Sequence, residues 1–397
     1  MKHLGDIAAI DWSKVEPVDV VTGGSPCQGL SQAGLRKGLA DDRSGLYIEQ
    51  IRCVKELREA DVMRGRTGQF IRPRYMVWEN VPGAFSSGKP KGSDFAVVIE
   101  EIVKIAEPSA PVSVCVPDGG WTKSGCYYAQ DGSWSIAWRV HDAQFWGVPQ
   151  RRKRIALIAD FGGHSAPEIL FERKGLCRDN PQSGEKRKET AGATVCGIEG
   201  AIEPLCIEMT STKNTIVEDG ISPTLTARMG TGGNQVNAVL GFPLGFRAEN
   251  TKEYTETATT IVNGTRPGFC NGLVDAIGVV RRLTPLECER LQGYPDGWTD
   301  IGDWTDSKGK RRKATDSHRY KALGNSIALP FWKWMLKRIS SQYERDATLG
   351  SLFDGIGGFP LCWEQINGKG TARWASEIEE FPIAVTKIRF PEKEQTI

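Results

Sequence analysis

Cys27 is the residue best placed to act as a nucleophile. It lies in the segment Gly-Gly-Ser-Pro-Cys-Gln at 23–28, directly after the apolar run at 18–22, which predicts a buried strand. Ligands bind beyond the carboxyl ends of strands in open α/β sheets, and a thiolate there is a good nucleophile. Most cysteines are packing residues, but the flanking glycines and proline distinguish Cys27 from the other nine. We therefore predict a catalytic thiol at this position.

Glu79 and a group of polar residues near 150 lie at the ends of two further predicted strands. Glu79 follows the apolar run at 75–78, where a carboxyl group could give a proton or a hydrogen bond. Gln150, Arg152 and Arg154 precede the apolar run at 155–159, and alternate residues of a strand share a face. Converging guanidinium groups suit recognition of phosphates or base edges. Taken alone, Glu79 is equally well interpreted as a solvated acid, and the basic residues at 150–154 are better interpreted as a solvated basic edge.

A glycine-rich turn near the carboxyl end predicts a nucleotide-like ligand. The predicted strand 349–353 runs into Asp-Gly-Ile-Gly-Gly at 354–358, and an apolar helix follows. Glycines in this position let the backbone approach a ligand and expose the N–H groups of the helix. Glu377 lies 19 residues after Gly358, at the end of the next predicted strand, where an acid normally holds a ribose hydroxyl. The motif by itself does not separate a nicotinamide cofactor from S-adenosylmethionine.

The elements that must position these residues alternate between strands and helices in the first and last parts of the chain. Helices are predicted over 44–59, 94–107, 285–292 (with Thr284 as N-cap), 331–343 and 379–389. Residues 162–278 have no sustained period and many Gly, Thr, Ser and Asn. We predict an α/β fold with a doubly wound, mostly parallel sheet over 1–161 and 279–397, and a smaller, irregular β-rich domain over 162–278.

Composition excludes several classes of protein. The 397 residues carry 51 Lys+Arg against 49 Asp+Glu, and 39% are hydrophobic, which excludes a disordered or fibrous chain. No apolar run is long enough to cross a bilayer, and the first residues lack a secretory signal, so we expect a cytoplasmic protein. The ten cysteines lack zinc-site spacing, so no metal is expected. The net charge of +2 gives no argument for a nucleic-acid partner. Only the local basic segments at 150–154 and 308–313 indicate one.

Together, these segments resemble the DNA (cytosine-5)-methyltransferase family. The matching segments are Pro-Cys-Gln at 26–28, Glu-Asn-Val at 79–81, Gln-x-Arg-x-Arg at 150–154, Phe-x-Gly-x-Gly-Gly at 353–358, the late helix motif at 281–298 and Gly-Asn-Ser-Ile at 324–327. The resemblance implies methyl transfer from S-adenosyl-L-methionine to C5 of a cytosine flipped out of double-stranded DNA. Cys27 would add to C6, Glu79 would hold N3, Arg154 would hold O2, and Arg152 would help to hold the flipped base.

The same resemblance implies the ligand contacts. The cofactor would lie on Phe353, Asp354, Gly355, Ile356, Gly357 and Gly358, with Glu377 on the ribose, Ile378 on the adenine ring and Asp6 on the adenine amine. The rest of the cofactor pocket would be Ile7, Pro26, Leu46, Asn325 and Ser326. The DNA contacts would include Gln28, Ser31, Gln150, Thr224 and Leu225. The enzyme would be a monomer that needs no protein partner.

The order of the motifs departs from the family. The cofactor turn, which usually comes first, here comes last, and the segment after Glu377 continues naturally into Asp6 at the start of the chain. The sequence is therefore interpreted as circularly permuted. Three alternatives stay open: an RNA cytosine methyltransferase, an inactive DNA-binding protein on the same scaffold, and a nicotinamide-dependent enzyme.

Overall fold

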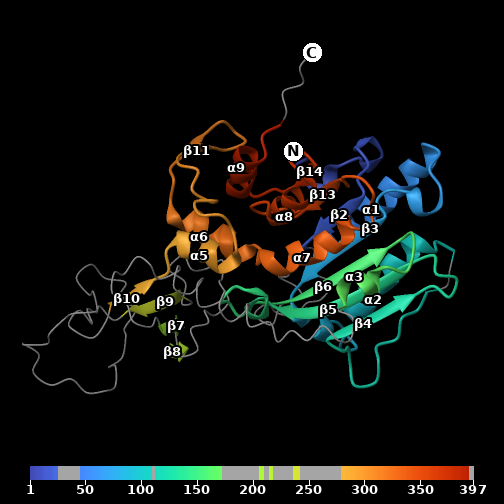
Figure 1. Cartoon of the computed structure of the whole chain (residues 1–397), viewed down its shortest axis with the longest axis horizontal. Helices are drawn as coiled ribbons and strands as arrows, with labels where there is room; N and C mark the ends of the chain where they lie inside the picture. The colour runs from blue at the N-terminus through green and yellow to red at the C-terminus, as the bar shows by residue number, and fades with distance from the viewer. Residues whose placement is uncertain are drawn as a thin grey trace, which may run out of the picture.

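The computed structural model describes residues 1–25, 45–109, 112–171, 205–209, 214–217, 236–241 and 279–392, and it describes the strands within 205–282 by their backbone alone. An eight-stranded sheet forms its centre, in the order β1-β14-β13-β2-β3-β6-β5-β4 (Figure 1). The strands of this sheet are β1 (Lys2–His3), β2 (Val20–Gly23), β3 (Tyr75–Asn80), β4 (Ser124–Tyr128), β5 (Ser135–Asp142), β6 (Lys153–Asp160), β13 (Leu349–Leu352) and β14 (Ala372–Ser376).

The direction of the strands changes halfway across the sheet. The five strands from β1 to β3 are parallel, as predicted, whereas β6, β5 and β4 run antiparallel to their neighbours. The sheet is therefore mostly parallel, as predicted, with its three antiparallel strands together at one side. Parallel neighbours need a long crossover, usually a helix, and only a short 3-10 turn over Ala143–Trp146 lies between β5 and β6.

Helices cover both faces of the sheet. One face packs against α1 (Gly45–Met63) and α2 (Ser93–Ala106), and the other against α3 (Ala166–Leu170), α7 (Leu329–Ser340), α8 (Gly358–Asn367) and α9 (Glu380–Arg389). Alternate residues of β3 divide between the two cores: Val77 faces the α7 side, and Met76 and Trp78 face the α1 side. The doubly wound arrangement follows from this alternation.

The helix α5 (Pro285–Gln292) begins and ends where the sequence predicts. The side chain of Thr284 accepts a hydrogen bond from the N–H of Glu287, and the Glu287 side chain accepts one from the N–H of Thr284. This reciprocal cap satisfies two of the N–H groups that a helix start leaves open. Helix α6 (Asp316–Asn325) was not predicted, because its sequence has little apolar periodicity.

A second sheet lies within the segment that connects the two parts of the large sheet. Its four antiparallel strands, β7 (Leu205–Met209), β8 (Asn214–Val217), β9 (Val236–Gly241) and β10 (Val279–Arg282), have the order β10-β9-β7-β8. The strand β10 leads directly into α5. Residues 166–170, which the sequence analysis assigned to the smaller domain, instead form α3 and pack on β5 and β6.

Segments from the two ends of the described chain lie side by side. The edge strand β1 pairs in parallel with β14, and the amino group of Met1 donates a hydrogen bond to the carbonyl of Phe390 at 3.2 Å. The chain start is next to α9 in Figure 1. One sheet is thus built from segments that are more than 350 residues apart in the sequence.

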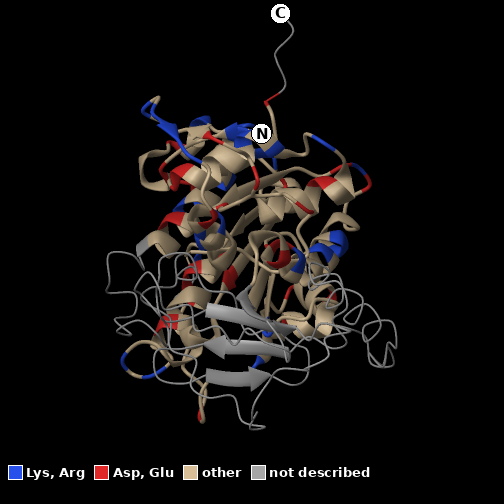
Figure 2. Cartoon of the chain, turned by 90° about the vertical axis from the view of Figure 1, so that its left-hand side faces the viewer, with Lys and Arg blue, Asp and Glu red and all other residues tan. Residues whose placement is uncertain are grey.

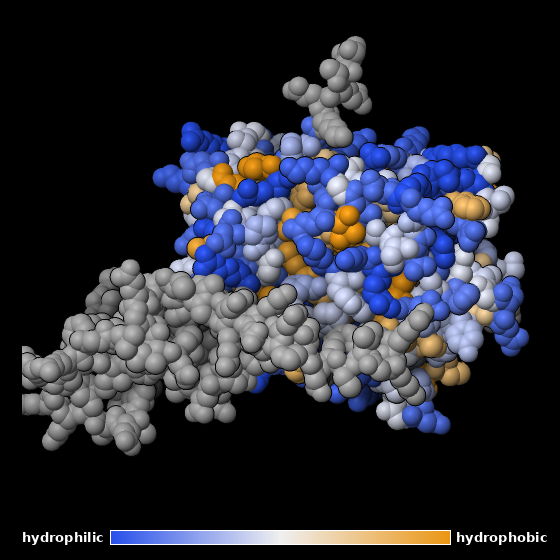
Figure 3. Space-filling model, viewed as in Figure 1, coloured by the Kyte–Doolittle hydropathy of each residue, from blue (hydrophilic) through white to orange (hydrophobic). Residues whose placement is uncertain are grey.

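Most of the described surface seen in Figure 3 is hydrophilic, with small separate hydrophobic patches. None of the described helices is both long and apolar enough to span a bilayer.

Candidate active site

The glycine turn between β13 and α8 has a backbone that few side chains could adopt. Gly355 and Gly357 have φ angles of +54° and +80°, in the left-handed region that favours glycine. A Cβ atom on Gly355 would meet nothing within 4 Å, so this side of the turn is open to a ligand. Helix α8 begins after its N-cap residue, Gly357, and no described side chain caps the start of the helix. The first N–H groups of α8 are thus available to a ligand.

Glu377 is fixed beside this turn. Its Oε2 accepts a hydrogen bond from the N–H of Gly355 at 2.7 Å, and its Oε1 accepts bonds from the N–H groups of Ile378 and Glu379 at 2.7 and 2.8 Å. An ionised carboxylate has about four acceptor positions, so three bonds leave room for one ligand hydroxyl. Ile378, next to it, is 66% exposed, so an apolar side chain lies at the surface beside Glu377.

The loop that holds Asp6 reaches the same edge of the sheet. The Ser376 hydroxyl, at the end of β14, donates to the carbonyl of Gly5 at 2.7 Å, which holds the start of the loop against that strand. Asp6 itself is exposed, and one of its oxygens accepts from the N–H of Ala8 at 3.0 Å. The side chain of Ile7 is instead buried in the core, so it anchors the loop and is not exposed to a ligand.

Asp354 has an unusual environment for a carboxyl group. Only 6% of the residue is exposed, its Oδ1 accepts a hydrogen bond from the Ser351 hydroxyl at 2.6 Å, and its Oδ2 has no hydrogen-bond partner among the described residues. Burial raises the pKa of Asp354 to about 7, and the nearby charge of Glu377 acts in the same direction. A buried oxygen without a partner, beside an open glycine turn, suits a ligand that carries a positive charge or donor groups.

The segment 324–327 packs directly on the glycine turn. A Cβ on Gly358 would lie 2.5 Å from the Oη of Tyr294 and 2.8 Å from Cγ1 of Ile327. Ser326 is buried and shares a hydrogen bond with the Tyr294 hydroxyl, whereas Asn325 is exposed. The structure therefore brings two of the predicted cofactor segments into contact. The sequence analysis missed Tyr294, because an aromatic residue just after a helix is more often a packing residue.

Glu79 forms the second half of the site. Its Oε1 lies 2.8 Å from the Nε of Arg154, and both side chains are largely buried. On its other side, a Cβ on Gly24 would be 2.8 Å from Oε2 of Glu79, so a side chain there would displace the Glu79 carboxylate. The Ser25 hydroxyl accepts a hydrogen bond from the Trp78 indole at 3.1 Å. The chain that leads into the predicted nucleophile is thus held against Glu79.

Arg152 and Arg154 bind different partners. Arg152 is 2% exposed, and its guanidinium group donates to the carbonyls of Gly324, at 3.2 Å, and Ser326. It thereby ties the start of β6 to the segment that packs on the glycine turn. Gln150 is fully buried, and neither atom of its amide has a hydrogen-bond partner among the described residues.

Several predicted site residues fall elsewhere. Leu46 is the second residue of α1 and packs partly buried on the core below β2. Pro26, Cys27, Gln28, Ser31, Thr224 and Leu225 lie outside the described residues. Within the part of the chain that the structure describes, no three His, Cys, Asp or Glu side chains are grouped in a way that could hold a metal ion.

The chain is similar in sequence to a protein family and to individual known proteins. The family model described as C-5 cytosine-specific DNA methylase matches residues 1–105 and 127–341. A protein of Escherichia phage P1 named DNA N-6-adenine-methyltransferase is 28% identical over 432 residues, which cover 85% of this chain and 55% of that protein. This chain therefore spans about half the length of that relative.

Two further similarities cover most of both chains. The orphan methyltransferase M.SPRI of Bacillus phage SPR is 23% identical over 431 residues, covering 86% of this chain and 87% of the relative. The crystal structure of the S. pombe Dnmt2 methyltransferase covers 84% of this chain and 83% of its own, with 14% identity and a TM-score of 0.41.

Proposed function

Because this chain belongs to the C-5 cytosine-specific DNA methylase family, we propose that it methylates C5 of a cytosine within a specific sequence of double-stranded DNA. The methyl donor of the family is S-adenosyl-L-methionine, which supplies a methyl group bound to a positively charged sulfur. The observation that carries the proposal is the position of Glu79, between Arg154 and the glycine that lies three residues before Cys27.

The edge that holds Asp6, the glycine turn and Glu377 fits this cofactor. The open side of Gly355 leaves space for a backbone–ligand contact, and the free acceptor position of Glu377 suits a ribose hydroxyl. The exposed side chain of Ile378 offers an apolar surface for the adenine ring. Asp6 keeps one oxygen free to accept from the adenine amine, because only its Oδ1 accepts from the N–H of Ala8 in the 3-10 turn that Asp6 caps. Asn325 and Ser326 complete the pocket.

The proposed reaction begins with a bond from the Sγ of Cys27 to C6 of the cytosine. The electron pair of the C5–C6 double bond forms a C4–C5 double bond, and the pair of the C4–N3 double bond takes a proton from Glu79 at N3. The resulting enamine is nucleophilic at C5. C5 would then take the methyl group, and the pair that bound this group to sulfur would stay on the sulfur. A base removes the proton from C5, the C5–C6 double bond re-forms as the Cys27 thiolate leaves C6, and N3 returns its proton to Glu79. The net change is a methyl group in place of one proton.

Arg154 has two tasks in this scheme. It orients the Glu79 carboxyl group through the 2.8 Å contact and presents its remaining N–H groups to O2 of the base. Because C6 is not accessible inside a duplex, the cytosine has to leave the stack. We propose that Gln28, Ser31, Gln150 and Arg152 help to hold the extruded base, Arg152 through the backbone that it binds.

We assign the reading of the DNA sequence to the part of 162–278 that follows α3, with Thr224 and Leu225 near the extruded base. Three strands of the four-stranded sheet, β7, β8 and β9, lie in this region and support its assignment as a separate recognition unit. We also propose that the motif order is circularly permuted. Two observations support this: β1 pairs with β14, and the family model ends at residue 341, before the glycine turn.

The first test is a base-resolution map of 5-methylcytosine in DNA from cells that express the protein. The proposal predicts one enriched sequence motif, and an unmethylated genome at good expression contradicts it. N6-methyladenine is mapped in the same DNA, because one relative is named for that activity. Methylation of adenine alone would overturn the cytosine assignment.

A second test separates the remaining alternatives. Duplex DNA containing 5-fluorocytosine at the mapped site should form a covalent complex, and the Cys27→Ala variant should form none. An inactive binding protein would form no covalent complex with any DNA. A preference for transfer RNA over the duplex would indicate the RNA methyltransferase, and calorimetric binding of NAD in place of S-adenosylhomocysteine would indicate the nicotinamide-dependent enzyme.

A further inference from the structure

A short hairpin between α5 and α6 carries the densest positive charge in the described chain. It consists of β11 (Trp304–Thr305), a turn, and β12 (Arg311–Arg312). Every residue from 307 to 316 is exposed. The basic side chains are Lys308, Lys310, Arg311, Arg312 and Lys313. In Figure 2 this loop projects from the upper part of the molecule and is mostly blue.

The hairpin is rigidly built, although all of its basic residues are exposed. One carboxylate, that of Asp306, accepts hydrogen bonds from the N–H groups of Lys308 and Lys310 at 3.1 and 2.8 Å and from Nε of Arg312 at 2.8 Å. These bonds fix the turn, and they hold the pKa of Asp306 below its usual value, the bond from Lys310 contributing most. A fixed loop loses little conformational entropy when it binds a partner.

The hairpin is also anchored next to the cofactor edge. Trp304 is buried against the rings of Phe381 and His318, and the N–H of Ser307 donates to Oε2 of Glu380 at 2.8 Å. Glu380 opens α9, three residues after Glu377. The position of the charge is therefore set relative to α9 and the cofactor edge.

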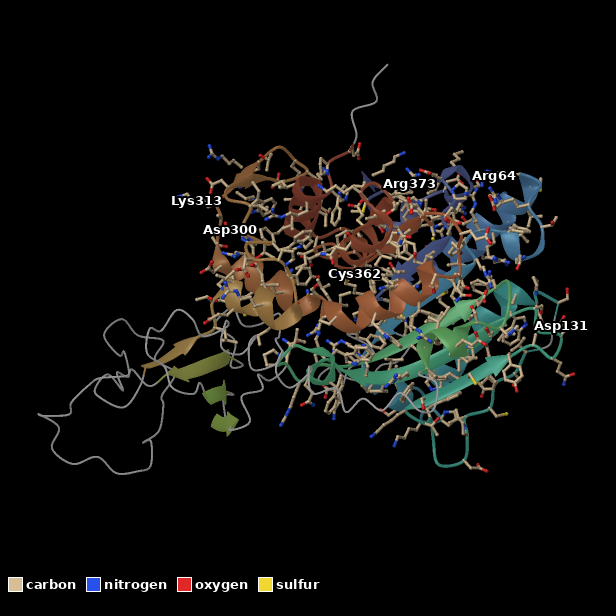
Figure 4. The ribbon with its side chains drawn as sticks, viewed as in Figure 1. Arg64, Asp131, Asp300, Lys313, Cys362 and Arg373 are labelled. Atoms are coloured by element: carbon tan, nitrogen blue, oxygen red, sulfur yellow. The ribbon has the colours of Figure 1, made fainter. Side chains whose placement is uncertain are left out.

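Three of the five positive charges are not neutralised locally. Arg311 pairs with Asp303 at 3.3 Å, and Arg312 pairs with Asp306 at 2.8 Å. Lys308, Lys310 and Lys313 form no ion pair with any described residue. Figure 4 shows Lys313 at the outer side of the hairpin, above Asp300. Lysines presented in this way act as point charges for phosphate groups.

We propose that this hairpin is a second DNA contact, which binds the phosphate backbone of the duplex outside the recognition sequence. In Figure 1, β11 and the four-stranded sheet lie on the same side of the large sheet, with α5 and α6 between them. A duplex held by the four-stranded sheet would extend past α5 and α6 to the hairpin. Phosphate contacts of this kind set the position of the protein on DNA and carry no sequence information. This inference rests on the proposed function.

The test replaces Lys308, Lys310 and Lys313 by Gln in the full chain. Affinity is measured by fluorescence anisotropy as a function of salt, on a duplex with one mapped site and long flanks and on a duplex without the site. Each lost phosphate contact removes about 0.9 from the slope of log K against log salt. We expect the slope to fall by about 2 to 3 and the Kd to rise about tenfold at low salt, to a similar extent on both duplexes.

The matched control replaces Lys55, Lys91 and Lys123 by Gln. These three lysines are also exposed, and they lie on or next to α1, α2 and β4, away from the hairpin. This control should keep the slope of the wild-type protein, and both variants should keep its Tm and its affinity for S-adenosylhomocysteine. An unchanged slope in the hairpin variant, or an equal loss in the control, overturns the inference.

The two proposals fail in different ways. Suppose that the wild-type protein methylates the duplex and that the hairpin variant binds it with unchanged affinity and slope. This result overturns the hairpin contact alone. A wild-type protein that neither methylates nor binds duplex DNA overturns the proposed function and, with it, the contact.

Discussion

The Oε1 of Glu79 lies 2.8 Å from the Nε of Arg154, although the two residues are 75 positions apart in the chain. Glu79 is near the end of β3, and Arg154 is near the start of β6. They meet because these strands are antiparallel, with Glu79 paired to Ala156 and Asn80 to Ile155. If β3 and β6 were parallel, the start of β6 would lie at the other end of the strands, away from Glu79. The reversal of strand direction after β3 is therefore what assembles this half of the site.

The first prediction concerns the contribution of Arg154 to the rate of methyl transfer. Arg154→Gln should lower the single-turnover rate by about 10- to 100-fold, because Glu79 loses its orienting partner and the base loses a donor. Arg154→Lys should recover only part of the rate, since an ammonium group lacks the planar fork of a guanidinium. Calorimetry should give a wild-type affinity for S-adenosylhomocysteine in both variants. A wild-type rate in Arg154→Gln would contradict the assignment.

The second prediction concerns the pH dependence of stability through Asp354. Its pKa in the folded protein is about 7, above the ordinary value of 3.8, because the carboxyl group is buried. Between these values the folded state binds more protons than the unfolded state, so stability decreases as the pH rises and levels off above about 7. Urea unfolding from pH 4.5 to 8.5 should show that wild type loses stability relative to Asp354→Asn, with a slope of at most about 1.4 kcal/mol per pH unit.

The same comparison contains its own control. Other groups titrate in this range, including His3, whose pKa burial lowers to about 4. These groups are present in both proteins, so they cancel in the difference between wild type and Asp354→Asn. A difference that is independent of pH would show that Asp354 does not titrate there.

The elements of the site could be predicted because their signals are local. The strand before the glycine turn, predicted over 349–353, spans Leu349–Leu352, and α5 has the predicted bounds because Thr284 and Glu287 cap its start. Glycines at 355 and 357 indicate a left-handed backbone wherever they occur in such a turn. Local patterns of this kind need no knowledge of the neighbouring elements.

The partners of buried polar side chains could not be predicted in the same way. Arg152 and Arg154 are two residues apart, but one binds the carbonyls of Gly324 and Ser326 and the other binds Glu79. Which partner each meets depends on the sheet order and on the packing of α6, and both are properties of the whole fold. The assignments of Cys27, Thr224 and Leu225 lie outside the described residues and stay predictions.

The third prediction separates two glycines of the cofactor turn. Gly355→Ala adds a methyl group that meets no protein atom within 4 Å and would occupy the space proposed for the ligand. It should therefore weaken S-adenosylhomocysteine binding at least tenfold, while it lowers stability by only about 1 kcal/mol. Gly357→Ala places its methyl 2.6 Å from the Phe390 ring, so it should lower stability by more, about 2 to 3 kcal/mol. Calorimetry and urea unfolding of both variants test the contrast, and equal effects on both properties would refute it.

The fourth prediction concerns Arg152 as a positioning residue. Arg152→Met fills similar space but leaves the carbonyls of Gly324 and Ser326 without their buried donor, so unfolding free energy should fall by about 2 to 4 kcal/mol. The 324–327 segment packs on the glycine turn, so the Kd for S-adenosylhomocysteine should also rise. Arg373→Met is the control, because its contact with Glu16 is exposed and should change stability by less than about 0.5 kcal/mol. If Arg152→Met lowered stability but left the Kd unchanged under native conditions, Arg152 would support the fold without positioning the cofactor segment.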